Sequence, residues 1–112
     1  MQVRNLSTTI AVPLARAYDF AHRPDNFPKW AEGMTADARV DYTPKNEYGI
    51  LDHRVHVGDK VIYVPLRMIA NGDGTEVVFT LFREPEMSDA DFARDEAMVV
   101  KDLANLKALL EK

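Results

Sequence analysis

The chain has 112 residues, a net charge of -4 and no cysteine. This length fits one domain, residues 1–112, with a single core. Without cysteine the chain has no disulfide, no thiolate catalysis and no sulfur-based zinc site, and its acidic balance without a Lys/Arg cluster argues against nucleic acid as the main partner.

The first half of the chain predicts one strand and two short helices. Residues 3–12 are rich in Thr, Ile and Val and end at a proline, which is typical of a strand. Residues 13–20 have apolar side chains at helical spacing, which predicts a short helix directly after the strand. Two further prolines make the next helix a separate piece, over residues 25–32. Phe27 and Trp30, three residues apart, are predicted to fill the core together.

The middle of the chain predicts an antiparallel sheet. Strand-like runs follow one another at residues 35–43, 48–57, 60–70 and 75–84. The last three are joined by Gly58-Asp59 and by residues 71–74, which contain two glycines, and both segments are strong hairpin signals. Neighbouring strands are therefore predicted to pair in the order in which they occur.

The two turns also predict the register of these strands. The shorter turn pairs Val57 with Lys60, and the longer turn pairs Ala70 with Thr75. One face is then almost wholly apolar, with the pairs Leu51–Leu66, His53–Val64, Val55–Ile62, Met68–Val77, Leu66–Phe79, Val64–Leu81 and Ile62–Arg83. The other face is polar and carries Asp52, Arg54, His56, Tyr63, Arg67, Glu76 and Thr80. A bulge at Gly49 would exchange the faces and turn Asp52, Arg54 and Arg67 inward.

The end of the chain, residues 88–112, predicts one long amphipathic helix. Ser88 can cap its first turn, and Asp91, three residues on, can accept a hydrogen bond from a backbone amide in return. An apolar stripe follows at helical spacing, made of Phe92, Val99, Leu103, Leu106 and Leu110. Because a lone helix cannot bury such a stripe, we expect it to lie against the apolar face of the sheet.

This arrangement resembles the SRPBCC or START-like superfamily, whose helix-grip fold is that of the birch-pollen allergen. The residues that carry the resemblance are 9–13, 17–20 and 24–30 near the start, and 79–83, 87–89, 102–103 and 106–107 near the end. The latter resemble the end of small bacterial polyketide cyclase-like members. The resemblance implies an α+β helix-grip fold: a curved antiparallel sheet wrapped around a long C-terminal helix, with two short helices after the first strand.

The resemblance further implies a cavity between sheet and helix that takes up apolar ligands such as lipids, sterols or polyketides. Its lining would be Leu51, Val55, Val64, Leu66, Met68, Phe79 and Leu81 from the sheet and Val99, Leu103 and Leu106 from the helix. The same residues are also what an ordinary close-packed core uses, so a filled interior stays an equal alternative.

Three polar residues lie close to this predicted lining. His53 lies between Leu51 and Val55 on the apolar face, where its imidazole is either a proton-transfer group or a buried side chain satisfied by one hydrogen bond. Glu96 lies beside the helical stripe, where a carboxylate needs a partner, and Arg83 on the sheet is the expected one.

Three functions follow from these observations. The first is a module that binds an apolar or aromatic small molecule, oriented by His53, Glu96 or Arg83. The second is an enzyme of the polyketide cyclase or dehydratase type, with His53 as general acid-base and Tyr63 or Arg83 steadying an enolate. The third is a non-catalytic interaction domain with a filled core, dimerising through a sheet edge.

The sequence indicates neither a cofactor nor a metal. It contains no P-loop, nucleophile elbow or dinucleotide fingerprint, and its histidines are not spaced as metal ligands. The first five residues lack the apolar run of a secretion signal, and no stretch reaches membrane-spanning length. We therefore expect a soluble, cytoplasmic protein that does not insert into a membrane.

Overall fold

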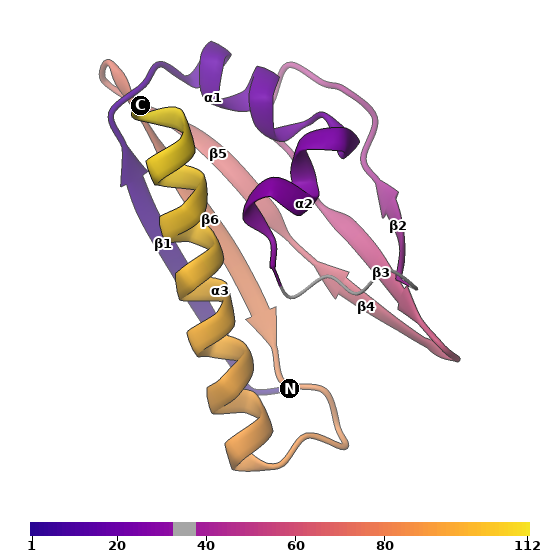
Figure 1. Cartoon of the computed structure of the whole chain (residues 1–112). Coiled ribbons are helices and arrows are strands. Elements are labelled where there is room, and N and C mark those ends of the chain that lie inside the picture. Colours follow the sequence, from indigo (N-terminus) through magenta and orange to yellow (C-terminus); the bar gives the residue numbers. More distant parts are fainter. Residues whose placement is uncertain (33–37) are drawn as a thin grey trace.

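The computed structural model describes residues 1–32 and 38–112, and its elements follow the predicted order (Figure 1). The elements are β1 (Val3–Ile10), α1 (Leu14–Ala21), the 3-10 turn η1 (Pro24–Asn26), α2 (Phe27–Trp30), β2 (Arg39–Tyr42), β3 (His53–Val57), β4 (Lys60–Val64), β5 (Leu66–Asn71), β6 (Gly74–Phe82) and α3 (Asp89–Leu110). Of the predicted strand over residues 35–43, positions 35–37 lie outside the described residues.

The predicted strand over residues 60–70 is in fact two strands, because Pro65 interrupts it. Proline has no backbone N–H and cannot donate to a strand ladder. β4 therefore ends at Val64 and β5 begins at Leu66. The described residues thus form six strands, where the sequence predicted five.

The predicted strand over residues 48–57 begins later than expected, at His53. The side chain of Asn46 organises the preceding segment, because its Oδ1 accepts from the amides of Tyr48 (2.9 Å) and Ile50 (3.1 Å). These local bonds compete with a strand ladder. Ile50 forms only an isolated bridge, with Arg67.

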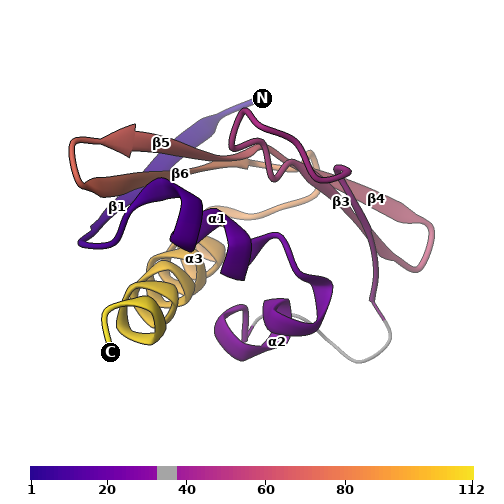
Figure 2. The same cartoon turned by 90° about the horizontal axis from the view of Figure 1, so that it is seen from above.

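The six strands form two three-stranded sheets, with orders β1-β6-β5 and β2-β3-β4. Residues 49–51 join them: Leu51 N donates to Leu66 O (2.8 Å), and Met68 N donates to Gly49 O (2.9 Å). The chain from residue 49 to 57 therefore borders β5 first and β4 afterwards. The two sheets together make a strongly curved surface around the helices (Figures 1 and 2).

The predicted hairpin registers are confirmed on both sides of Pro65. The observed pairs include Val57–Lys60, Val55–Ile62, His53–Val64, Ala70–Thr75, Met68–Val77 and Leu66–Phe79. The predicted pairs Val64–Leu81 and Ile62–Arg83 are wrong, because the β5–β6 ladder ends at Leu66–Phe79 and β4, on the other side of Pro65, pairs with β3 alone among the described strands. Gly49 has a φ of 73°, yet the faces are not exchanged, since Asp52 still pairs with the exposed Arg67.

α3 confirms the predicted helix, its cap and its buried stripe. Asp91 N donates to Ser88 Oγ (3.0 Å), and Ser88 N donates to Asp91 Oδ2 (3.2 Å). The whole predicted stripe is buried. α3 lies along β1 and touches α2 on its other side (Figures 1 and 2). Phe27 and Trp30 fill the core from α2, as predicted.

Among the described residues, no helix is long and apolar enough to cross a membrane.

Candidate functional site

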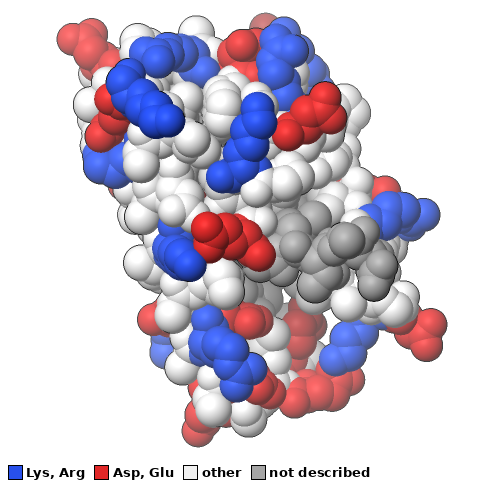
Figure 3. All heavy atoms as spheres, in the orientation of Figure 1, with Lys and Arg blue, Asp and Glu red and all other residues white. Residues whose placement is uncertain are grey.

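The apolar inner face of the second sheet opens toward the β3–β4 turn. Its deep end is formed by His53 and Val64, which are 4% and 7% exposed. One pair further along, Val55 and Ile62 are only half-buried, and Phe79 of β6 is half-buried as well. Figure 3 shows the surface hollowed between α3 and the β3–β4 hairpin. We use the name inner cleft for this group of side chains: His53, Val55, Ile62 and Val64 of the second sheet, with Phe79, Leu81 and Val99.

The other half of the predicted lining is a filled core. Leu66, Met68, Leu103 and Leu106 are at most 2% exposed and belong to one cluster of buried side chains. The cavity beside this cluster has about 10 Å³, close to the space of one water molecule, and is lined by Ala21, His22, Phe27, Tyr42, Thr43, Leu51 and Leu66. In this part of the interior the described residues therefore pack as an ordinary core.

His53 lies at the deep end of the inner cleft and is held by one hydrogen bond. Its Nδ1 is 3.0 Å from Leu51 O, and because a carbonyl only accepts, Nδ1 carries the proton. Nε2 is then the basic nitrogen of the neutral ring. The ring packs edge-on against Phe27, with centroids 5.2 Å apart, and beside Tyr42. Burial lowers the pKa of His53, which favours the neutral form at neutral pH.

The flank of α3 beside α2 carries two carboxylates that the sequence analysis did not select. Asp102 is 8% exposed, and its Oδ1 accepts from the backbone amide of Glu32 (3.1 Å), two residues beyond the end of α2. Burial raises the pKa of Asp102 to about 6. Asp95, seven residues earlier, is half-buried on the same flank, and burial raises its pKa too.

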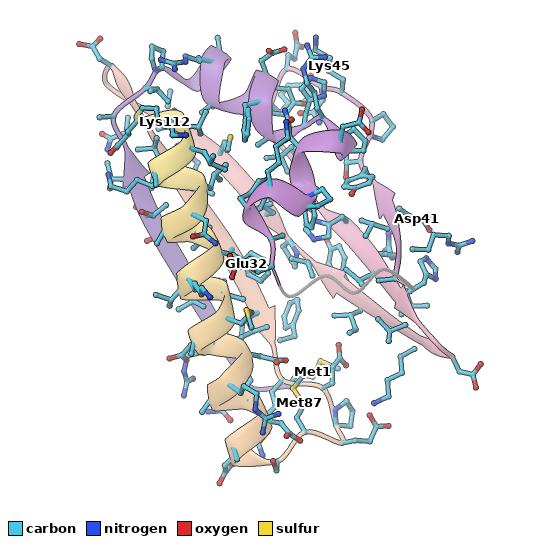
Figure 4. All side chains as sticks on the ribbon, viewed as in Figure 1. Met1, Glu32, Asp41, Lys45, Met87 and Lys112 are labelled. Carbon is cyan, nitrogen blue, oxygen red and sulfur yellow. The ribbon has the colours of Figure 1, made fainter. Side chains whose placement is uncertain are left out.

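A helical wheel could have identified both carboxylates, because residues seven apart beside an apolar stripe share one flank. What the wheel does not show is which flank meets α2. Figure 4 shows Glu32 beside α3, and Asn105 Nδ2 on the same flank donates to Trp30 O (3.4 Å). These contacts assign the Asp95–Asp102 flank to the side of the second sheet.

Glu96 and Arg83 lie elsewhere, and the predicted pair between them does not form. Glu96 is on the opposite flank of α3 and pairs with Arg4 of β1 (3.1 Å). Arg83 follows β6 and pairs with Asp89 in the first turn of α3 (2.7 Å), because the chain brings that turn directly beside it. Both residues line an open hollow of about 290 Å³ with Gln2 and Phe92, away from the inner cleft.

The polar face predicted for the sheet is an outer surface with its own network. Asp52 accepts two hydrogen bonds from Arg67 (2.8 and 2.7 Å), one from Tyr63 (3.0 Å) and one from Leu66 N (2.9 Å). The Arg67 guanidinium is the main reason that the pKa of Asp52 falls to about 2. Tyr63 is thus engaged by Asp52 on the outer face. An open hollow of about 320 Å³ lies here, and its lining includes Tyr42 and His53 as well as Asp52, Arg54 and Tyr63.

Within residues 1–32 and 38–112, no three His, Asp or Glu side chains are placed so that they could hold a metal ion together. His22 Nε2 and Trp30 Nε1 are buried without a hydrogen-bond partner among the described residues.

Solved structures show what the fold is. No protein-family model matches the sequence, and no curated protein matches it. The structure is similar to DynU16, of the dynemicin biosynthetic locus, with a TM-score of 0.77 and 13% identity over the whole chain and 48% of DynU16. It is similar to Aha1 from Colwellia psychrerythraea (TM-score 0.71, 16% identity, 99% and 97% of the two chains). It is also similar to Ara h 8.0201 (TM-score 0.69, 9% identity, 97% and 97%).

The chain thus spans about half of DynU16 and nearly the full length of the other two. All three have folds of the helix-grip type. Identities of 9–16% support a statement about the fold alone, and the described elements agree with it: two curved antiparallel sheets, short helices after β1 and a long final helix. The chain therefore has the α+β helix-grip fold that the sequence predicted.

Proposed function

We propose that this protein binds an apolar or aromatic small molecule in the inner cleft. The observation that supports the proposal is the half-buried state of Val55, Ile62 and Phe79, three apolar side chains on a concave face. Half-buried apolar side chains that gather on a concave face leave apolar surface that a ligand can cover. A ligand that covers them gains about 25 cal/mol for each Å² of apolar surface removed from water.

The residues around the cleft define the ligand further. Exposure of the apolar side chains falls from Val55 and Ile62 to the buried His53 and Val64, so an apolar molecule would cover the half-buried pair first. His53 Nε2 can accept a hydrogen bond from a hydroxyl or amide at the deep end. That DynU16 belongs to a biosynthetic locus supports a small-molecule role for this chain. We further propose that residues 1–112 act as a single cytoplasmic domain.

Catalysis by His53 is the second hypothesis, and the geometry gives it less support. A general acid-base needs a substrate within hydrogen-bond reach and usually a second polar group to stabilise developing charge. Of the two groups considered for that role, Tyr63 donates to Asp52 on the outer face and Arg83 lies beside Asp89. We therefore favour binding without turnover.

An interaction domain with a filled core is the third hypothesis. Its support is the tight interior around Leu66, Met68 and Leu106 and the cavity of only about 10 Å³ beside it. It predicts that apolar ligands do not shift the melting temperature. A ligand present at a hundred times its Kd would add about 2.7 kcal/mol to the free energy of unfolding, so thermal shift distinguishes the two hypotheses.

Neighbouring residues on β4 give the decisive test. Ile62 lines the inner cleft, whereas Val61 points to the outer face and is 51% exposed. We expect Ile62→Glu to weaken binding of the neutral probe 1-aminoanthracene at least about tenfold, the equivalent of 1.4 kcal/mol. Val61→Glu adds the same charge one residue away and should change the affinity less than about twofold.

Fluorescence titration of the wild type and both variants measures this difference, and circular dichroism checks that each is folded. Equal affinities for all three proteins would refute the cleft as the binding site. Native mass spectrometry of protein purified from its own host provides an independent test, since a bound metabolite appears as a discrete added mass.

A further inference from the structure

Asp95 of α3 carries a half-buried carboxylate that pairs with no cation among the described residues. It also accepts no hydrogen bond there, and its neighbour Arg94 pairs with Asp91 instead (3.3 Å). The sequence of residues 33–37 contains no Lys, Arg or His. A carboxylate that loses hydration without gaining a partner costs free energy, and a ligand that supplies the partner offsets this cost.

The side chain of Asp95 lies on the flank of α3 that faces the second sheet. Seven residues turn an α-helix through two turns less about 20°, so Asp95 shares its flank with Asp102. That flank meets the end of α2, where Asp102 Oδ1 accepts from Glu32 N (3.1 Å). Glu96, about 100° further around the helix, pairs with Arg4 of β1 on the opposite flank. Asp95 is therefore turned away from β1.

Asp95 is also level with the inner cleft. Arg4 is opposite Leu81 in the β1–β6 ladder, and its Nε is 3.1 Å from Glu96 Oε1. The helix turn that holds Asp95 and Glu96 is therefore at the level of Leu81, which is 8% exposed and belongs to the inner cleft. Val99, one turn later beside the same flank, belongs to it as well. The carboxylate thus borders the apolar side chains that the proposed ligand covers.

α2 covers this flank of α3 further along the helix but not at Asp95. The hydrogen bonds between the two segments are made by Asp102 and Asn105 (Figure 1). Asp95 is seven residues nearer the start of α3, which corresponds to about 10.5 Å. Asp102 is accordingly buried, at 8% exposure, whereas Asp95 is only half-buried. A ligand in the inner cleft can therefore reach the Asp95 carboxylate.

The sheet side of the inner cleft adds negative charge. Glu84, two residues after β6, is half-buried and lines an open hollow of about 170 Å³ together with Ile62. Among the described residues of this lining the one cation, Lys60, pairs with Glu86 (2.9 Å). Figure 3 shows acidic side chains at the margin of the hollowed surface. A cationic group is attracted to such surroundings, whereas an anionic group is repelled.

We propose that the ligand of the inner cleft is a hydrophobic amine, whose apolar body covers the half-buried side chains and whose ammonium group pairs with Asp95. The amine class rests on the binding function proposed above and narrows it. An ammonium group has three donors and no acceptor, so it can replace the water that the carboxylate loses. Fatty acids and other apolar carboxylates should be rejected, because their charge has the same sign as those of Asp95 and Glu84.

Three anthracene derivatives of the same ring system test the proposal. At neutral pH, 9-(aminomethyl)anthracene is a cation, 9-anthracenemethanol is neutral and anthracene-9-carboxylate is an anion. We expect the wild type to bind the amine at least about tenfold more tightly than the alcohol, the equivalent of 1.4 kcal/mol, and the carboxylate more weakly than both. Fluorescence titration at low and high salt measures the Kd values. The preference for the amine should shrink at high salt, which screens the ion pair.

Two neighbouring positions of α3 provide the variants. Asp95→Asn removes the proposed partner, and Glu96→Gln is the matched control, since it removes the same charge one residue away on the opposite flank. We expect Asp95→Asn to bring the affinities for amine and alcohol within about twofold of each other, and Glu96→Gln to keep the preference of about tenfold. Asp95→Lys should reverse the order in favour of the carboxylate. Circular dichroism checks that each variant is folded.

The outcomes separate the amine class from the binding function. If the alcohol binds and the amine binds no more tightly, or if the preference survives Asp95→Asn, the ligand is not an amine held by Asp95, while the inner cleft remains a binding site. If none of the three compounds binds the wild type, the proposed binding function is wrong and the amine class is overturned with it.

Discussion

Gly49→Ala is expected to lower the free energy of unfolding by about 3–5 kcal/mol, the largest effect that we anticipate for a single methyl group. Gly49 has a φ of 73°, a conformation that costs other residues about 1–2 kcal/mol. A Cβ at this position would be 2.2 Å from Met68 O, which is backbone and cannot move aside freely. The shift would also strain the two hydrogen bonds that join the sheets, each contributing about 1 kcal/mol.

Two other glycines serve as matched controls for this prediction. Gly58 and Gly72 both have a φ of 59°, but a Cβ at either would meet no atom within 4 Å. Gly58→Ala and Gly72→Ala should therefore cost only the conformational part, about 1–2 kcal/mol. Urea unfolding of the three variants measures the differences. Equal losses for all three would show that the junction between the sheets is not tightly packed at Gly49.

Asp102→Asn is expected to raise the free energy of unfolding at pH 7.5 by up to about 3 kcal/mol. The pKa of Asp102 is about 6 in the folded chain, against 3.8 for an ordinary aspartate, because burial disfavours its charge. The folded state therefore holds the proton more tightly, and the wild type loses stability as the pH rises from 3.8 to 6. Each unit of difference in pKa corresponds to about 1.4 kcal/mol of stability. Asparagine removes the charge but keeps a side-chain oxygen that can accept the hydrogen bond from Glu32 N.

The pH dependence identifies the cause. The stability difference between Asp102→Asn and the wild type should be full above pH 7 and fall below about 1 kcal/mol at pH 4, where Asp102 is neutral in the folded chain. Asp102→Ala also removes the charge but leaves Glu32 N without its acceptor, so it should gain less or lose stability. Chemical unfolding at pH 4, 5, 6, 7 and 8 provides the comparison. A stability difference that is constant over this pH range would show that the charge of Asp102 does not cause the lower stability of the wild type.

The inner cleft was only partly predictable from the sequence, for reasons that particular residues show. His53, Val55 and Val64 were assigned to the right face because the Gly58-Asp59 turn sets their register locally. Ile62 was assigned to the same apolar face, opposite Val55, but was not predicted as a lining residue. Glu96 and Asp95 border the same apolar stripe on opposite flanks of the helix. The sequence does not tell which of the two flanks faces the second sheet, and Glu96 lies on the other one.

Local chemistry in the sequence determined the elements of this protein: prolines and glycines ended them, the Ser88 cap began the long helix, and alternation or helical spacing set their buried sides. These effects act over a few residues, so a linear pattern records them. Only the tertiary structure decided that residues 49–51 join the two sheets, that Asp102 meets the end of α2, and that Leu103 and Leu106 fill a core while Ile62 and Phe79 are half-buried. Those outcomes depend on how segments far apart in the chain pack together, and a local sequence pattern does not specify that packing.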